Sequence, residues 1–222
     1  MAVYKVRIEA LSPLHLSSGK ADVTLDAEVV HDVYGIPLFP AKRFKGLLYE
    51  SALEVVEMAE LSGRRFLVRE TVEELFGHAA LAQAEADGEP LKLIVHDLHP
   101  EGYEALRKDM AYLMRRYKEA LRPEDILGEY TSLRFQTEID KVTGTAMENS
   151  LHNMQVVEAD DLVFTGEIEL VGAEERHREA LALAFANLRS AGLKRNRGFG
   201  KIRCTMQDQE ELLAAALRKD VG

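Results

Sequence analysis

The sequence has a single cysteine, Cys204, among its 222 residues. One cysteine excludes an internal disulfide framework and a cysteine-based metal site, and it is typical of a protein in a reducing compartment. The chain also lacks any apolar run close to the roughly 18 residues of a membrane span, and its first residues do not have the pattern of a signal peptide. We therefore expect a cytoplasmic protein with no membrane partner.

What the sequence does contain is ordinary for a globular protein. Hydrophobic residues make up 46% of the chain and charged residues 30%. This balance excludes a disordered, collagen-like or membrane protein. A chain of this length can bury a substantial core, either as one large domain or as a compact domain with a sizeable insertion.

The net charge of -10 at first argues against binding to nucleic acid. The positive charge is segregated, however: residues 180–207 contain no acidic residue and six basic ones. A second basic cluster, Lys42, Arg43 and Lys45, opens a predicted helix, where free backbone N–H groups could bind phosphate. The glycine-rich turn 197–200 would let the backbone approach a ligand closely. The ordinary alternative is a set of solvated surface charges beside a turn.

Hydrophobic periodicity predicts the regular elements. Alternating residues at 3–10 indicate a half-buried strand, and an extended piece follows at 27–31. Further strands are predicted at 91–95, 162–171 and 201–207. Helical spacing predicts helices over residues 41–61, 70–76, 101–120, 174–191 and 210–218.

This order of elements predicts an α+β fold with a ferredoxin-like or RRM-like βαββαβ core. We expect the core at about 1–97 and 162–207, an insertion at about 98–160 and a tail helix at 208–222, all in one domain. The polar stretch 130–155, in which only Leu133, Phe135 and Ile139 favour strand, predicts an extended hairpin or arm. Such a fold alone says little about function.

Four blocks of sequence, in order along most of the chain, together resemble the RAMP superfamily, and specifically the backbone subunit of type III CRISPR effector complexes. The first is Leu-His-Leu-Ser-Ser-Gly at 14–19. The second runs from Asp26 through Gly-Ile-Pro-Leu-Phe-Pro at 35–40 to Phe-Lys-Gly at 44–46. The third, at 134–146, resembles the thumb hairpin of that family, and the fourth, at 192–201, resembles its terminal glycine-rich loop with an Arg-Gly-Phe-Gly-Lys end.

The resemblance implies a RAMP domain that polymerises along CRISPR RNA together with further copies, paralogous backbone subunits and other type III effector subunits. A complementary target RNA would pair with the guide. In catalytic members a loop aspartate directs metal-dependent cleavage of the target at regular intervals, and by position Asp26 is that residue. It would be both the catalytic residue and the ligand of a divalent cation, Mg²⁺ or Mn²⁺. From composition alone, the favoured role of Asp26 is to cap a turn beside Thr24.

The resemblance also implies two sets of RNA-contacting residues. Contacts to the guide backbone would position RNA without reading its sequence. These residues are His15, Ser17, Lys42, Arg43, Lys45, Arg195, Arg197, Gly198, Phe199, Gly200 and Lys201. The thumb residues would be Asp140, Lys141, Thr143 and Met147.

Three other interpretations stay open. One is a non-catalytic scaffold of the same complex, in which Asp26 is inert. Another is a metal-independent CRISPR-repeat endoribonuclease that uses His31 or His15 as general base. A more distant third is a ferredoxin-like metabolite sensor with no affinity for RNA. The pair His96 and His99 has the spacing of zinc ligands, but no third ligand lies nearby, which favours an ordinary pair at a strand end.

Overall fold

The computed structural model describes residues 1–19, 28–78, 90–118, 120–137, 145 and 152–218. Its main sheet is built around β1 (Ala2–Ala10), which pairs antiparallel with β6 (Val163–Val171) on one side and β7 (Ile202–Met206) on the other. Strand β2 (Lys92–Val95) pairs with β6, so the order across the sheet is β2-β6-β1-β7. The short β3 (His99–Pro100) also pairs with β6.

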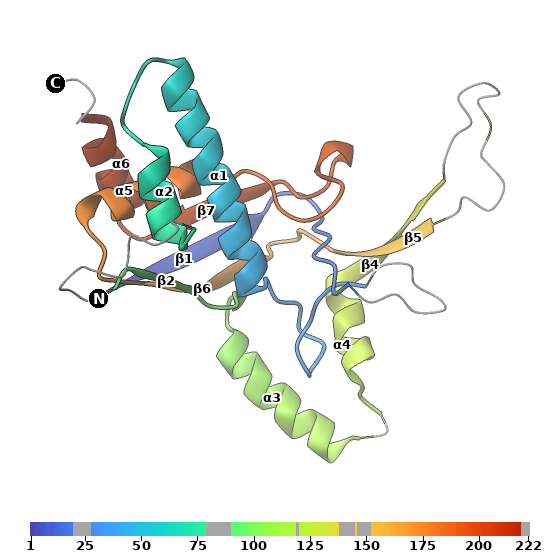
Figure 1. Cartoon of the computed structure of the whole chain (residues 1–222). Helices are drawn as coiled ribbons and strands as arrows, with labels where there is room; N and C mark the ends of the chain where they lie inside the picture. Colours follow the sequence, from blue (N-terminus) through green and yellow to red (C-terminus); the bar gives the residue numbers. More distant parts are fainter. Residues whose placement is uncertain (20–27, 79–89, 119, 138–144, 146–151, 219–222) are drawn as a thin grey trace.

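The predicted alternation in the first strand is confirmed. The four alternate residues of β1 that face the core are buried, and their neighbours are more exposed. Buried side chains at every second position are what one covered face of a sheet requires. The covering helices are α1 (Ala41–Leu61), α2 (Arg69–Phe76), α5 (Glu175–Asn187) and α6 (Gln209–Arg218), which Figure 1 shows together on one side of the sheet.

Aromatic side chains fill the space between these helices and the sheet. Phe44 of α1 is fully buried, and its ring meets Phe39 and Phe185 edge-on at centroid distances of 5.6 and 5.7 Å. Edge-to-face pairs of this kind add to the gain from burying apolar area. The cluster therefore ties α1 to α5 and to the segment that leads into α1.

The helix predicted at 41–61 is confirmed as α1, and the helices predicted at 70–76 and 210–218 are found within one residue. The helix predicted over 174–191 was too long, because α5 ends at Asn187. The Arg189 carbonyl accepts a hydrogen bond from Ile202 N at 3.0 Å, and Ser190 pairs with Lys201. Residues that pair with the start of β7 cannot continue a helix.

The insertion carries two helices and a hairpin. The helix predicted at 101–120 is shorter, as α3 (Tyr103–Arg116), and α4 (Pro123–Tyr130) was not predicted. The predicted hairpin is confirmed as β4 (Thr131–Gln136) paired with β5 (His152–Val157). Figure 1 shows this hairpin standing away from the main sheet. None of the described helices is both long enough and apolar enough to cross a bilayer.

The expected extended piece at 27–31 is described only from residue 28, and there it forms isolated pairings rather than a strand. Val29 pairs with Ser17, and His31 pairs with Pro37. The end of this segment thus lies against the loop that follows β1.

The glycine-rich segment 190–201 folds back onto that same loop. Gly192 has φ +83°, and a Cβ at this position would lie 2.6 Å from the His15 carbonyl oxygen. Gly198 has nearly the same φ, +84°, but no atom lies within 4 Å of the place of its Cβ. The two glycines therefore share a backbone conformation that favours glycine, and only Gly192 is also required by close packing.

We expect Gly192→Ala to lower the free energy of unfolding more than Gly198→Ala. The strain of a left-handed alanine costs about 1–2 kcal/mol at either position, and the clash with His15 adds about 1–3 kcal/mol at residue 192. Urea denaturation of both variants measures the difference. Equal reductions in stability would contradict the close packing.

Candidate nucleic-acid interface

Two segments distant in sequence converge on residues 11–18, the loop after β1. Leu14 exchanges two backbone hydrogen bonds of 2.8 Å with Val157 at the end of β5. The glycine-rich segment donates to the same loop, from Gly200 N to the Pro13 carbonyl at 2.9 Å and from Leu193 N to the His15 carbonyl at 3.1 Å. The loop after β1 is thereby fixed between the hairpin and the glycine-rich segment.

His15 lies at the centre of this junction and is 1% exposed. Its Nδ1 donates a hydrogen bond to the Gln155 carbonyl oxygen at 2.6 Å, so Nε2 carries the lone pair of the neutral ring. Nε2 is buried and has no hydrogen-bond partner among the described residues. Burial lowers the pKa of His15. The hydrogen bond to Gln155 acts in the opposite direction and raises the pKa, whereas the positive charges of Lys194 and Arg43 lower it further.

Gln155 connects the loops around His15, and sequence patterns gave no sign of it. Its side-chain Oε1 accepts from Val29 N at 3.2 Å, and its Nε2 donates to Thr131 Oγ1 at 2.9 Å. One residue of β5 thus holds the loop after β1, the backbone at Val29 and the start of β4. Nothing in the local sequence marks a glutamine in a polar hairpin for this role.

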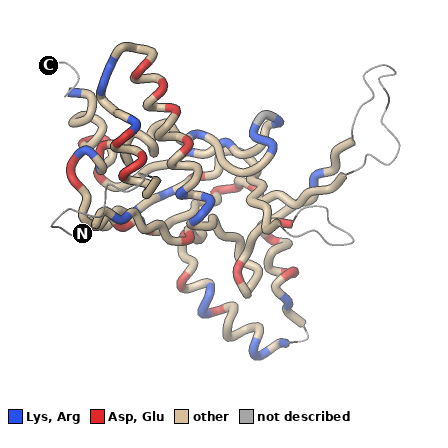
Figure 2. The backbone as a smooth tube through the Cα atoms, in the orientation of Figure 1, with Lys and Arg blue, Asp and Glu red and all other residues tan. Residues whose placement is uncertain are grey.

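The basic end of the glycine-rich segment faces solvent. A single 3-10 turn, Arg195–Arg197, exposes both arginines, and Gly198 and Lys201 are also exposed. Phe199 is half-buried and Gly200 is buried. Lys194 takes up φ +57° and donates from Nζ to Gln136 Oε1 at 2.5 Å, at the end of β4. In Figure 2 the lysines and arginines of this segment appear in blue on the loop between the helical body and the hairpin.

The second basic cluster divides into residues with different surroundings. Arg43 donates from Nη2 to the Ser17 carbonyl at 2.9 Å, and Lys42 is exposed at the start of α1. Lys45 instead donates from Nζ to the Leu93 carbonyl of β2 at 3.1 Å, and burial lowers its pKa. The structure therefore brings Arg43 to the loop after β1, whereas the Lys45 ammonium is bound to the backbone of the sheet.

One backbone N–H group at the start of α1 is bound by a side chain of the same protein. The Asp97 Oδ1 accepts the Ala41 N–H at 2.7 Å, which supplies from the end of β2 the cap that Pro40 lacks. Asp97 was not predicted for this role, because a cap from a residue 56 positions away leaves no local pattern.

Several predicted site residues lie outside the described part of the chain. These are Asp26 and the thumb residues Asp140, Lys141, Thr143 and Met147. Within the described residues, no three His, Cys, Asp or Glu side chains come together as a metal-binding group.

The two histidines with zinc-like spacing have separate partners. His96 Nε2 lies 2.7 Å from Glu169 Oε1, and the His99 ring stacks on Tyr103 with centroids 3.9 Å apart.

The state of His15 makes stability depend on pH. Its folded pKa lies below the value of 6.5 for the free side chain, so the unfolded chain takes up a proton that the folded chain does not. Stability must then fall as the pH drops below about 6.5. We expect the unfolding free energy of His15→Gln to decrease less steeply on acidification than that of the wild type. The pKa of His99 is also lowered by burial, but His99 is present in both proteins and contributes equally to both profiles. Denaturation at a series of pH values tests this, and identical profiles would contradict a buried, neutral His15.

The chain was compared with known proteins by sequence and by structure. A search by sequence against curated proteins finds no match. Among solved structures, the chain is similar to a subunit in the cryo-EM structure of the type III-B Cmr-β complex bound to cognate target RNA. The TM-score is 0.60 at 14% identity, over 96% of this chain and 99% of that one. A chain of the apo state of Cmr-β matches with a TM-score of 0.58 at 14% identity, over 92% and 96% of the two chains.

These likenesses concern the fold. The family model of the RAMP superfamily matches residues 7–203, which include the loop after β1, the hairpin and the glycine-rich segment. Over that range the chain belongs to the RAMP superfamily.

Proposed function

We propose that this protein binds guide RNA as a backbone subunit of a type III CRISPR effector complex. The observation that carries the proposal is the basic glycine-rich segment, held against the loop after β1 in a chain that belongs to the RAMP superfamily. The solved chains of similar fold come from type III-B Cmr-β complexes, one of them bound to target RNA. The sheet order β2-β6-β1-β7 with helices on one face supports a ferredoxin-like core for this domain.

The exposed Arg195, Arg197 and Lys201 offer charge to phosphates, and the backbone around Gly198 is open to a close approach. Arg43 and Lys42 extend this positive surface beside Ser17. No base-specific pocket is needed, since contacts to the phosphate backbone fix the register of RNA and accept any sequence. This suits a subunit that must bind guides with different spacers.

His15 has a positioning role in this proposal. Its ring is buried and bound to Gln155, and its main-chain carbonyl receives the glycine-rich segment. A buried Nε2 is poorly placed to act as a general base on RNA, which disfavours the repeat-endonuclease alternative for this residue.

Target cleavage is the finer part of the proposal, and it assigns Asp26 as the catalytic residue. Asp26 lies two residues before Glu28, whose carbonyl accepts from Ser18 N at 2.8 Å beside the loop after β1. A divalent cation would supply charge stabilisation at the scissile phosphate. The described residues bring together no set of ligands for it, so the assignment rests on Asp26 alone.

RNA binding is tested with Arg195→Ala/Arg197→Ala. We expect weaker binding of single-stranded RNA of any sequence and a log-affinity slope against log salt that is less steep by about 0.7 for each phosphate that is no longer neutralised. Fluorescence anisotropy over a salt series measures both. The control Arg218→Ala removes an exposed charge from the end of α6 and should leave affinity and slope unchanged. Unchanged binding by the double variant would contradict the proposed interface.

Cleavage is tested in the complex assembled with guide, complementary RNA and Mg²⁺. Asp26→Ala should slow cleavage at the regularly spaced sites by about 10²-fold or more while guide binding is retained. Asp22→Ala, in the same segment, is the matched control and should cleave normally. Cleavage that persists in Asp26→Ala would exclude Asp26 as the catalytic residue. A wild-type protein that binds the guide but never cleaves the target would favour the interpretation as a non-catalytic scaffold.

A further inference from the structure

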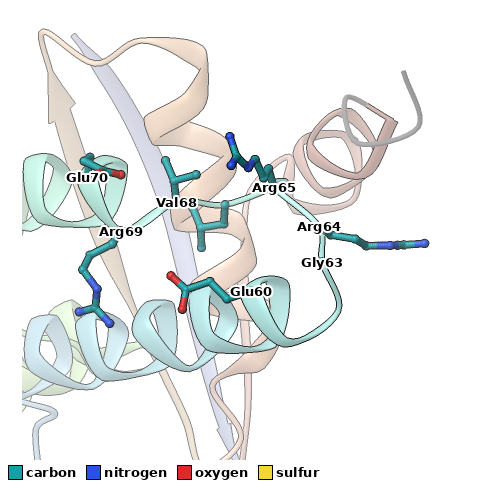
Figure 3. A pocket seen from close by; sticks show the side chains of 8 residues that line it. Glu60, Gly63, Arg64, Arg65, Val68, Arg69 and Glu70 are labelled. Carbon is teal, nitrogen blue, oxygen red and sulfur yellow. The ribbon is translucent and has the colours of Figure 1, made fainter.

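A cavity of about 680 Å³ lies between the end of α1 and the start of α2. The chain turns sharply where α1 ends, because Gly63 has φ +69° and the Arg64 N–H donates to the Ala59 carbonyl at 2.9 Å. The segment that follows runs back beside α1, as Figure 3 shows, and the cavity lies between the two. Its volume is within the range of roughly 300–1,000 Å³ that is typical of small-molecule sites.

Two side chains of opposite charge are directed into this cavity. They are Glu60 of α1 and Arg69 of α2, both labelled in Figure 3. Within the described part of the chain, neither of them forms an ion pair or a side-chain hydrogen bond. The carboxylate and the guanidinium are therefore available to a ligand that carries both negative charge and hydrogen-bond donors.

The remaining charged residues of the lining lie around this pair. They are Arg64, Arg65 and Glu70, all exposed. Figure 3 shows the Arg64 and Arg65 side chains directed away from Glu60. Among the described residues, the lining thus has three arginines and two glutamates, so its net charge is positive and favours an anion over a zwitterion.

Two apolar residues complete the lining. Leu67 is 5% exposed and closes the cavity toward the core, whereas Val68 is 38% exposed. They provide a surface without hydrogen-bonding groups beside the charged pair. An apolar wall with a few polar groups that fix orientation is the usual composition of a site for a small organic molecule.

The chemistry of the charged pair indicates the class of ligand. A guanidinium binds phosphate through paired, charge-assisted hydrogen bonds. A carboxylate accepts hydrogen bonds from the hydroxyl groups of ribose, as acidic residues do in dinucleotide-binding folds. A ligand that carries a phosphate and neighbouring sugar hydroxyls therefore satisfies Arg69 and Glu60 together.

We propose that this cavity binds a phosphorylated sugar, either free or as part of a nucleotide. Its phosphate contacts Arg69, its sugar hydroxyls donate to Glu60, and its carbon skeleton or base lies against Val68. Inorganic phosphate would leave Glu60 without a donor, and a nucleoside without phosphate would leave Arg69 without an acceptor. Each of these smaller ligands makes only half of the contacts.

The cavity is separate from the candidate nucleic-acid interface. Arg43 lies at the start of α1 beside that interface, and Glu60 lies near the end of the same helix. A helix rises about 1.5 Å per residue, which places the two residues about 25 Å apart along its axis. Figure 1 shows the end of α1 on the side of the molecule away from the hairpin. The inference therefore does not depend on the proposed function.

Ligand binding to the full-length chain is measured by isothermal titration calorimetry. The probes are AMP, ribose 5-phosphate, adenosine and inorganic phosphate. We expect AMP to bind about tenfold or more tightly than adenosine or phosphate, because each of these lacks one charge-assisted contact. Tighter binding of AMP than of ribose 5-phosphate identifies a nucleotide, and equal binding identifies a sugar phosphate. Phosphate that binds as tightly as AMP, or no binding of any probe, overturns the proposal.

The contact to phosphate is tested with Arg69→Ala. We expect this variant to bind AMP about tenfold or more weakly, since it loses a charge-assisted hydrogen bond. Arg64→Ala is the matched control, because it removes the same charge from the same segment but its side chain is directed away from Glu60. Its affinity should change by about twofold at most, since salt screens a charge without direct contact. Equal effects of the two substitutions would contradict the assigned contact.

The contact to the sugar is tested with Glu60→Gln. Wild-type protein should prefer AMP to its 2′,3′-dideoxy analogue, which lacks the two hydroxyls. Glu60→Gln should bind AMP more weakly and lose this preference. The control Glu57→Gln changes an exposed glutamate one turn earlier on α1 that does not line the cavity, and it should keep the preference. A Glu60→Gln variant that retains the preference overturns the role of Glu60.

A titration of AMP in the presence of a saturating short single-stranded RNA separates this inference from the proposed function. Unchanged affinity for AMP supports a separate site, as does normal AMP binding by Arg195→Ala/Arg197→Ala. Competition between RNA and AMP would place AMP at the nucleic-acid interface and overturn the inference. A protein that binds AMP but no RNA contradicts the proposed function and leaves the cavity as a site. A protein that binds RNA but none of the probes overturns only the inference.

Discussion

The close approach of Gly192 to the His15 carbonyl is the constraint on which the candidate interface depends. A side chain at residue 192 would place its Cβ 2.6 Å from that oxygen, so the two loops meet backbone to backbone. The approach is reinforced by hydrogen bonds from Leu193 to His15 and from Gly200 to Pro13. Because these bonds use main-chain atoms, the exposed side chains of Arg195 and Arg197 remain available to a ligand while the loop that carries them is held in place.

Burial and charge are separated in space in this protein. The ring of His15 is enclosed and its pKa is lowered, while the positive charges of Arg43 and Lys194 lie close enough to contribute to that lowering. The interface thus has a neutral, hydrogen-bonded centre and a basic rim. The acidic residues that dominate the net charge lie largely on helices elsewhere, as the glutamates of α1 show in Figure 2. Whole-chain charge is therefore a poor guide to what one face of the molecule binds.

Much of the fold was predictable because its elements have strong local patterns. The alternation of β1 and the helical spacing of α1 each reflect one buried face, and both were predicted within a residue of their ends. The end of α5 was not predicted, because it is set by the pairing of Arg189 and Ser190 with the start of β7. Helix α4 was not predicted either, because it has only eight residues and only Leu127 among them is buried, which is too short a segment for a helical period to stand out.

The sequence by itself determined the element types, the segregation of positive charge and the glycines at the turns, because these depend on residue type and on short spacing. Only the tertiary structure decided which of the basic residues come together. It brought Arg43 beside Ser17, bound Lys45 to the sheet and bound the Ala41 N–H at the start of α1 to Asp97. It also assigned Gln155 its place between three loops. Those outcomes rest on hydrogen bonds between residues dozens of positions apart, which local sequence patterns do not encode.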